Sequence, residues 1–333
     1  MSRARSVFLV GCIAAVAVVA PAQIRMRISI ENTVDHVQVR AVQRFADALS
    51  AKTAGQMTVE VYPEARLFRD RDVVAALLQG RVEMAVPGTW QLDRFEPAVG
   101  ALLLPAFFGR EPEYVHRLLD RGLGAEIDLR LTHNTGLVVL GRWIDLGAAH
   151  LFTIDRPLTH HDQVQGLTIR YAGGEANRMR LDALGASPVL IAWPDLRQRL
   201  DERAIDGVLT TFETVASARL WEHGIRYAFA DAQHFSHYVP LVSPQFWARL
   251  PEHLRSVIAV TWDEHVDAAR ADAAAAQIRA RRTLEANGVI VVDPAIDEIG
   301  RWRARLMGDQ PSMIEALGID RSFVEILPAP RDE

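Results

Sequence analysis

A segment without internal proline or glycine, from Pro251 to Asn287, is the feature that most constrains how this chain can fold. It is rich in good helix formers, including Ala273–Ala276, and Asn287-Gly288 is a typical helix stop. An unbroken helix over this segment would reach about 55 Å at about 1.5 Å per residue. A chain of 333 residues is also too long for one compact core. We therefore expect two lobes and one long helix that crosses both.

The first part of the chain predicts a strand-helix-strand unit. Residues 25–30 and 57–62 alternate between polar and apolar side chains, which is typical of strands. Between them, apolar residues recur at helical spacing from Val42 to Leu49, and Ala54-Gly55 ends that helix. This order of elements favours a parallel sheet.

A short helix that leads into a strand with an acidic residue occurs twice. The first copy is Asp70–Leu78 with a strand around 83–86, and the second is Asp195–Leu200 with a strand around 205–209. Two halves built on one plan suggest two α/β lobes that face each other across a cleft. Further strands are expected at 136–140, 167–171, 188–191, 238–242 and 289–292.

The N-terminus predicts a secretory signal over residues 1–22, and hence export to the periplasm. Arg3 and Arg5 precede the apolar run Val7–Ala20, which ends in a small-x-small cleavage pattern. The run is shorter than the roughly 20 apolar residues of a spanning helix, so a membrane anchor is the weaker alternative, as is acylation of Cys12. Because Cys12 is the only cysteine, the mature chain would have no disulfide and no thiol chemistry.

Composition and motifs argue against several classes of function. The formal net charge is −5 at pH 7 and no basic block follows the leader, so nucleic acid is not an expected partner. The sequence contains no Gly-x-Ser-x-Gly elbow, no His-Glu-x-x-His zinc helix and no Walker A loop. We therefore predict neither a catalytic site nor a cofactor.

Histidines beside acidic residues raise the question of a metal site. His160-His161-Asp162 has metal-ligating side chains, but Thr159 with Asp162 three residues later forms a capping box, which favours a helix start. His234 and His237 are interpreted as loop or core residues. The prediction is therefore that the chain has no metal site.

Arg170 is the strongest candidate for ligand binding from the residues alone. It closes the apolar strand Leu167–Ile169, and open α/β sheets present ligand-binding groups at strand ends. A guanidinium clamps a carboxylate with two parallel charge-assisted hydrogen bonds. The alternative is a structural ion pair with a nearby acid. The aromatic residues at or just after predicted strands, which could form the walls of a cleft, are Trp90, Trp143, Trp193 and Phe212.

A series of short motifs follows in a characteristic order along the chain. They are His36, Arg44-Phe45-Ala46, Lys52-Thr53-Ala54-Gly55, Val59–Pro63, Leu67, Gln79–Ala85, Leu104–Phe107, Gly166–Arg170, Leu184–Val189 and Ala204–Gly207. In their order and spacing the chain resembles the DctP-type solute-binding proteins of TRAP transporters over nearly its whole mature length. The resemblance implies an α/β, two-lobed periplasmic-binding-protein fold (type II-like) with a long lobe-spanning helix. The expected lobes are 23–147 plus 236–275, and 148–235 plus 276–333.

The resemblance also implies roles for individual residues. In that family the arginine matching Arg170 forms the salt bridge to the ligand carboxylate, while Trp193 and Thr210 match an aromatic and a pocket-asparagine position. The family often has a second arginine where Ala149 stands, and His150 beside it is left as a hydrogen-bond donor. The predicted ligand-binding residues are Arg170, Trp193, Thr210, Trp90, His150, Phe212, Asn32 and His36.

The resulting expectation is a monomeric solute-binding protein without enzymatic activity. It would capture a small organic acid through its carboxylate and deliver it to the membrane subunits of a TRAP-type transporter. Because Ala149 supplies no second positive charge, the pocket offers the ligand fewer polar contacts. This favours a ligand with one carboxylate and an apolar or aromatic body over a polyhydroxylated sugar acid. The alternatives are a periplasmic sensor that docks on a signalling receptor, and a hydrolase or lyase on the same fold.

Overall fold

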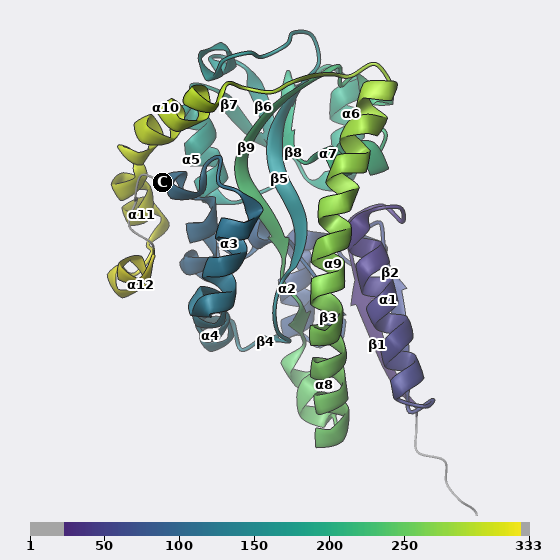
Figure 1. Cartoon of the computed structure of the whole chain (residues 1–333). Helices are drawn as coiled ribbons and strands as arrows, with labels where there is room; N and C mark the ends of the chain where they lie inside the picture. Colours follow the sequence, from purple (N-terminus) through teal and green to yellow (C-terminus); the bar gives the residue numbers. More distant parts are fainter. Residues whose placement is uncertain (1–22, 328–333) are drawn as a thin grey trace, which may run out of the picture.

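A computed structural model describes residues 23–327, which form a mixed α/β protein with two sheets (Figure 1). The predicted secretory signal, residues 1–22, lies outside the described residues. Within the described part, none of the helices combines the length and the apolar character that crossing a bilayer requires. The expectation of an α/β fold with one long helix is thus confirmed.

The first sheet has five strands in the order β2-β1-β3-β10-β4. β1 pairs in parallel with β2 and β3, while β10 pairs antiparallel with β3 and β4. This confirms the predicted parallel strand-helix-strand unit. The strands are β1 (Ile24–Ser29), β2 (Met57–Tyr62), β3 (Met84–Ala85), β4 (Val138–Val139) and β10 (Leu241–Val242).

The second sheet has six strands in the order β11-β9-β5-β8-β6-β7. They are β5 (Ile144–Thr153), β6 (Thr168–Tyr171), β7 (Ser187–Leu190), β8 (Gly207–Thr210), β9 (Tyr227–Tyr238) and β11 (Ile290–Val292). The long antiparallel pair β5 and β9 was not predicted, although it forms the middle of the sheet. Both strands are buried along most of their length, so their hydropathy does not alternate as it does in half-exposed strands.

Helices fill the intervals between the strands. They are α1 (Val37–Lys52), α2 (Asp70–Leu78), α3 (Pro112–Leu118), α4 (Gly124–Thr135), α5 (Glu175–Ala183), α6 (Leu196–Asp201), α7 (Phe212–Ser217), α8 (Pro244–Arg249), α9 (Glu252–Ala286), α10 (Ile296–Met307), α11 (Gln310–Leu317) and α12 (Arg321–Ile326). Three short 3-10 turns also matter below: η1 (Thr89–Gln91), η5 (His161–Val164) and η6 (Trp193–Asp195).

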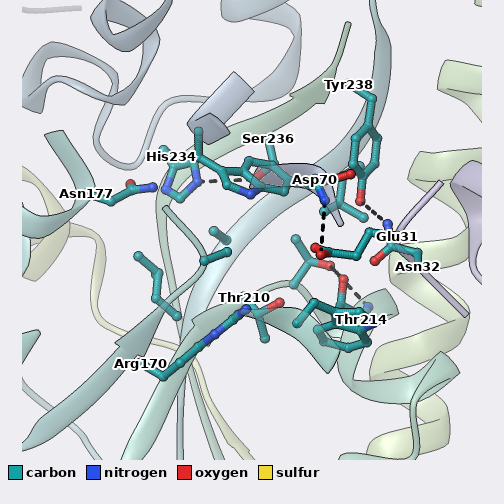
Figure 2. Close-up of a pocket in the computed structure, with 17 residues that line it drawn as sticks. Glu31, Asn32, Asp70, Arg170, Asn177, Thr210, Thr214, His234, Ser236 and Tyr238 are labelled. Atoms are coloured by element: carbon teal, nitrogen blue, oxygen red, sulfur yellow. Dashed lines mark hydrogen bonds between the residues drawn. The ribbon is translucent and has the colours of Figure 1, made fainter. Parts of the chain in front are cut away.

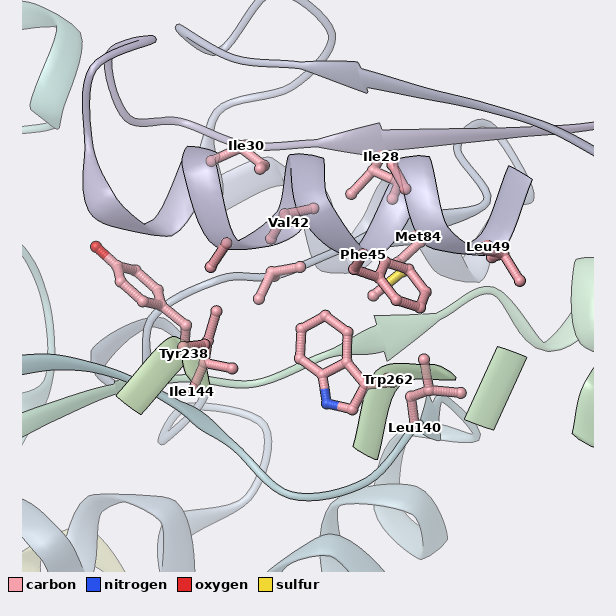
Figure 3. Close-up of a cluster of buried hydrophobic side chains, with 14 of the residues drawn as sticks. Ile28, Ile30, Val42, Phe45, Leu49, Met84, Leu140, Ile144, Tyr238 and Trp262 are labelled. Carbon is pink, nitrogen blue, oxygen red and sulfur yellow. The ribbon is translucent and has the colours of Figure 1, made fainter. Parts of the chain in front are cut away.

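The long helix α9 runs beside both sheets and matches the predicted segment closely. It packs against α1 at one end and against β5 and α7 further along. Trp262 of α9 meets Phe45 of α1 edge to face with ring centroids 5.2 Å apart, inside a cluster of buried apolar side chains (Figure 3). The indole Nε1 of Trp262 donates to the Arg142 carbonyl at 2.9 Å, so its one polar atom is satisfied.

The C-terminal helices pack into two separate apolar clusters. Trp302 and Leu306 of α10 are buried with Ile169 of β6, whereas Met313 of α11 and Phe323 of α12 join a cluster that contains Leu131 of α4. The predicted lobe division assigns residues 276–333 to one lobe and places its other boundaries inside β5 and β9. That division stays a prediction.

The turn at η5 begins one residue later than the predicted capping box. The cap residue is His160, whose side chain accepts from the Gln163 backbone while the Gln163 side chain accepts from the His160 backbone. The predicted box of Thr159 and Asp162 is therefore wrong, although a helical turn does start here. Gln163 is the residue three positions after the cap, and its long amide reaches back to the chain.

Candidate functional site

A cavity of about 50 Å³ lies where the ends of β6 and β8 meet β9 and the loop after β1 (Figure 2). That volume accommodates several water-sized spheres, and therefore only a small molecule. The lining side chains combine charged, polar, aromatic and apolar groups. They belong to Glu31, Asn32, Asp70, Trp90, Leu146, Ala149, Arg170, Ala172, Asn177, Trp193, Leu209, Thr210, Thr211, Thr214, His234, Ser236 and Tyr238.

Arg170 reaches this cavity from β6, where side chains alternate between the two faces of the sheet. Ile169 points into an apolar cluster, and Arg170 points the other way, with only 2% of its surface exposed. Its Nε donates to the Ile191 carbonyl at 2.9 Å. Among residues 23–327, no carboxylate forms an ion pair with it, and the Ile191 carbonyl is its hydrogen-bond partner. Burial lowers the pKa of Arg170 to about 10, and the Glu31 charge opposes that shift, so the guanidinium stays charged at neutral pH.

Arg180 is the second fully buried arginine near the cavity, and its environment differs. Its guanidinium donates to Gln233 Oε1 at 3.2 Å, to Asn177 Oδ1 at 2.6 Å and to the Leu103 carbonyl, and it lies 3.0 Å from His234 Nδ1. Protein groups thus occupy the donors of Arg180. Arg170, by contrast, keeps donors for a ligand.

An acidic pair, Glu31 and Asp70, lies on the opposite side of the cavity from Arg170 (Figure 2). The Glu31 carboxylate accepts from the Asp70 backbone N–H at 3.2 Å. Burial raises the pKa of Glu31, and burial together with Glu31 raises the pKa of Asp70 well above its usual range. Two close buried carboxylates resist simultaneous ionisation, so the pair can present a proton donor as well as an acceptor.

β9 contributes three polar side chains to the cavity at alternate positions, His234, Ser236 and Tyr238. The guanidinium of Arg180 donates to His234 Nδ1, and burial lowers the His234 pKa well below its usual value, so the ring is neutral and carries its proton on Nε2. Nε2 lies 3.1 Å from Ser236 Oγ and donates to it. The Ser236 hydroxyl hydrogen is then free to point into the cavity.

Tyr238 and Asn32 are linked across the cavity wall. The Asn32 side-chain amide donates to Tyr238 Oη at 2.7 Å and to Gln38 Oε1 at 2.6 Å. Trp90 of η1 packs edge to face on Tyr238, with ring centroids 5.6 Å apart. Gly88 makes this packing possible, because a Cβ there would lie 2.3 Å from the Trp90 ring.

The predicted ligand-binding residues divide into two groups in the structure. Five of them line the cavity, namely Arg170, Trp193, Thr210, Trp90 and Asn32. Three do not, and we leave them out of the candidate site: His150, Phe212 and His36. Trp143, suggested as a cleft wall, is a core residue whose Nε1 donates to Asp128 Oδ1 at 2.8 Å.

The three excluded residues have structural contacts instead. His150 Nδ1 accepts from the Ala232 backbone at 3.0 Å, and the ring stacks obliquely on Phe212 at 4.8 Å. His36 caps α1 by accepting from the Gln38 backbone, and its Nε2 lies 3.1 Å from Glu213 Oε2. Burial lowers the pKa of both histidines, that of His150 to about 4.

Sequence reasoning missed several cavity residues, chiefly Glu31, Asp70, Asn177, His234, Ser236 and Tyr238. One signal was present: His234, Ser236 and Tyr238 are spaced two residues apart, which puts them on one face of a strand. Glu31 and Asp70 are distant in sequence and give no such pattern. Only the fold brings them together.

A wider cavity of about 520 Å³ adjoins the first, since Glu31, Trp90 and Ala172 line both. Its other walls come from η1, the start of α5 and the segment after β7, with polar residues such as Arg71, Asp93 and Gln198. This arrangement gives the inner cavity a polar vestibule.

Comparison with known proteins identifies relatives along most of the chain. The family model DctP, "Bacterial extracellular solute-binding protein, family 7", matches residues 28–313. The chain is 25% identical over 286 residues to the C4-dicarboxylate-binding periplasmic protein DctP of Rhodobacter capsulatus, with 84% of each chain covered. It is 20% identical to the sialic acid-binding periplasmic protein SiaP of Vibrio cholerae, covering 70% of this chain and 71% of the relative.

Solved structures share the fold. A sugar acid binding protein of Advenella mimigardefordensis, in complex with galactonate, superimposes with a TM-score of 0.85 at 19% identity, covering 91% of this chain and 96% of the other. A TRAP periplasmic solute binding protein of Sulfurospirillum deleyianum with bound succinate gives 0.82 at 17% identity, covering 92% and 98%. The resemblance found in the sequence is confirmed.

Proposed function

Because the chain belongs to the DctP family, family 7 of the bacterial extracellular solute-binding proteins, we propose that it binds a small organic acid and delivers it to TRAP-type membrane subunits. The observation that carries the proposal is the charged, buried Arg170 guanidinium, which faces a small cavity and has no ion-pair partner among the described residues. A buried charge without a partner is costly, and a ligand carboxylate supplies one.

The proposed ligand carries a single carboxylate. Arg170 is the only lysine or arginine among the residues that line the inner cavity. Glu31 and Asp70 face it across the cavity and disfavour a second ligand carboxylate. This supports the monocarboxylate predicted from the sequence, in which Ala149 replaces a second arginine.

The acidic pair also refines the body of the proposed ligand. Leu146, Ala149 and Leu209 offer an apolar wall, whereas Glu31 and Asp70 offer acceptors. A hydroxyl or ammonium group on the ligand would satisfy those acceptors. We therefore propose a small hydroxy or amino monocarboxylic acid, with an apolar portion between its two polar ends.

The proposed mechanism is binding without a chemical step. The acid enters through the vestibule, Arg170 takes its carboxylate, and Trp90 and Trp193 exclude water from the ion pair. Closure of the lobes over the ligand would mark the loaded protein for its membrane partner. The proposed delivery of the ligand to membrane subunits rests on the membership of this chain in the DctP family.

Calorimetric titration of Arg170→Ala tests the binding proposal. A thermal-shift screen of small carboxylic acids first identifies a ligand, since a molecule that binds only the native state raises its melting temperature. Loss of two charge-assisted hydrogen bonds should then weaken binding about 100-fold or more in Arg170→Ala. Arg44→Ala is the matched control, because Arg44 forms an exposed pair with Asp272 on the surface. Unchanged affinity in Arg170→Ala would refute the assignment.

Uptake into vesicles tests delivery separately. Labelled ligand should accumulate in proteoliposomes that contain TRAP-type membrane subunits only when the loaded protein is added outside. Normal ligand binding without any stimulation of uptake by such subunits would contradict the transport role and leave the binding site intact.

A further inference from the structure

Three potential metal ligands meet on the face of β9 that points away from the ligand cavity. They are His116 of α3, Asp145 of β5 and His237 of β9, and one side-chain atom of each lies within 4.8 Å of the others. His237 follows Ser236 in the strand, so the two side chains point to opposite faces. The cluster is therefore separate from the site proposed above.

Within this cluster, His237 gives the strongest indication that a ligand is bound. Its side chain is fully buried, and neither ring nitrogen has a hydrogen-bond partner among residues 23–327. Asp145 Oδ1, also buried, has none within the same range. Buried polar atoms are normally satisfied, because leaving them without partners costs free energy.

The spacing of the cluster suits a small tetrahedral ion. His116 Nε2 lies 2.7 Å from Asp145 Oδ2, and His237 Nε2 lies 3.7 Å from Asp145 Oδ1. Ligand atoms around zinc, at about 2.0–2.1 Å from the metal, are roughly 3.4 Å apart. The two distances run to different oxygens of Asp145, and the three ligand atoms lie within 4.8 Å of one another, so side-chain rotations would have to bring them to that spacing.

We propose that His116, Asp145 and His237 form a binding site for a divalent transition-metal ion of the zinc type. Two imidazoles and one carboxylate are a donor set that zinc accepts. A cavity of about 480 Å³, lined by His116 and Asp145, opens beside the cluster and supplies an entry path and water for the fourth position. Binding replaces the hydrogen bond between His116 and Asp145, since Nε2 of His116 must give its lone pair to the metal.

The nearby positive charge of Arg270 is already compensated. Its Nη1 lies 2.8 Å from Asp120 Oδ2, and its Nε donates to the Trp143 carbonyl at 3.1 Å, while the Nε–Asp145 Oδ1 distance is 3.9 Å. The closest partners of Arg270 are therefore Asp120 and the Trp143 carbonyl, and Asp145 lies beyond hydrogen-bond distance from it. A bound ion would tie α3 to β5 and β9, which gives the site a structural role.

Titration with zinc chloride tests the proposal on the full-length mature protein after treatment with a chelator. The wild type should bind one zinc ion per chain in a saturable manner, and its melting temperature should rise. Zinc-edge anomalous diffraction should place the ion between the three side chains.

Two variants make the test specific. His116→Ala should weaken zinc binding about 100-fold or more, since loss of an outer-sphere partner alone costs 10- to 100-fold. His116 is about one-quarter exposed, so this variant should still fold, as circular dichroism can check. His133→Ala, at an exposed histidine of α4, should bind like the wild type. Absence of stoichiometric binding in the wild type, or equal affinity in His116→Ala, would overturn the proposal.

Discussion

At the scale of single residues, two buried arginines show how environment assigns a role. Arg180 donates to three side chains and one carbonyl, and it orients His234 and Asn177 in the cavity wall. Arg170 has one carbonyl partner and otherwise faces the cavity. Burial depresses the pKa of both to about 10, so the pKa does not distinguish them. Their partners do.

Glu31→Gln should change ligand preference. Glutamine keeps the size of the side chain and an acceptor for the Asp70 N–H, but it removes the acidic group that faces the ligand. Lactate, if it binds, should lose affinity relative to propionate by about tenfold, because a charged acceptor binds a hydroxyl more strongly than a neutral one. Calorimetry on both acids measures the ratio. An unchanged ratio, as expected for the surface control Glu175→Gln, would contradict a contact between Glu31 and the ligand.

Asp128→Asn should stabilise the protein increasingly as pH rises. Burial raises the pKa of Asp128 to about 7, against about 3.9 in an unfolded chain. Between these values the native state binds the extra proton, so the wild type loses stability as pH rises from about 4 through 7. Asparagine keeps the acceptor for Trp143 and does not titrate. The variant should gain about 4 kcal/mol at pH 8 relative to pH 4, because about three pKa units at about 1.4 kcal/mol each separate the native and unfolded states of Asp128.

Urea unfolding of both proteins at pH 4 and pH 8 measures this difference. The comparison cancels the titration of other groups, such as His150, which the two proteins share. Parallel stability curves for the wild type and Asp128→Asn would contradict the assignment.

Part of the candidate site could be predicted because it is local in sequence. Arg170 lies near the end of an apolar strand that the sequence reveals, and Trp193 and Thr210 match motif positions of the family resemblance. Glu31 and Asp70 are 39 positions apart and meet only in three dimensions. His150 does not line the inner cavity, because its Nδ1 accepts from the Ala232 backbone on β9, a strand that was itself not predicted.

At the scale of elements, α9 could be predicted from the sequence, whereas the paired strands β5 and β9 could not. α9 has an uninterrupted run of good helix formers, so its 35 residues were predictable almost to their ends. β5 and β9 contain Asp145, His150, Asp231 and His234 within buried strands. These polar residues form hydrogen bonds inside the protein. In the sequence they interrupt the run of apolar residues by which a buried strand is recognised.

Two glycine-to-alanine substitutions should have opposite effects on stability. Gly147 of β5 has φ +133°, and a Cβ there would lie 2.6 Å from the amide of Gln277, which donates to the Leu146 carbonyl. Gly147→Ala should cost about 1–3 kcal/mol. Gly300 lies within α10 with no atom near its missing Cβ, so Gly300→Ala should add about 0.5–1 kcal/mol. Thermal and urea unfolding measure both, and a neutral Gly147→Ala would show that β5 relaxes.

At the scale of the whole molecule, several elements join the two sheets. β5 and β9 form most of their pairs in the second sheet, yet β9 leads directly into β10 of the first. α9 packs beside both sheets, and the C-terminal helices contact clusters that contain elements of each.

Unfolding should therefore be a single cooperative transition despite the two sheets. Separate unfolding of either sheet would expose the shared faces of α9 and of the C-terminal helices to water. Differential scanning calorimetry should give equal calorimetric and van't Hoff enthalpies. Two resolved peaks would contradict this expectation and indicate independently stable lobes.

The unequal anchoring of α9 has a mechanical consequence. The large side chains Leu254, Ile258, Trp262 and Val266 pack in the cluster around α1, which continues along α9 as far as Ala276, whereas Ala280 and Leu284 join the cluster around α7. A rigid rod of 35 residues is about 50 Å long, so a rotation of roughly 10° at one end moves the other by roughly 9 Å. We expect the helix to act as a lever fixed at its N-terminal half. Any sliding of the helix during lobe motion would then concentrate at the contacts that Ala280 and Leu284 make in the cluster around α7.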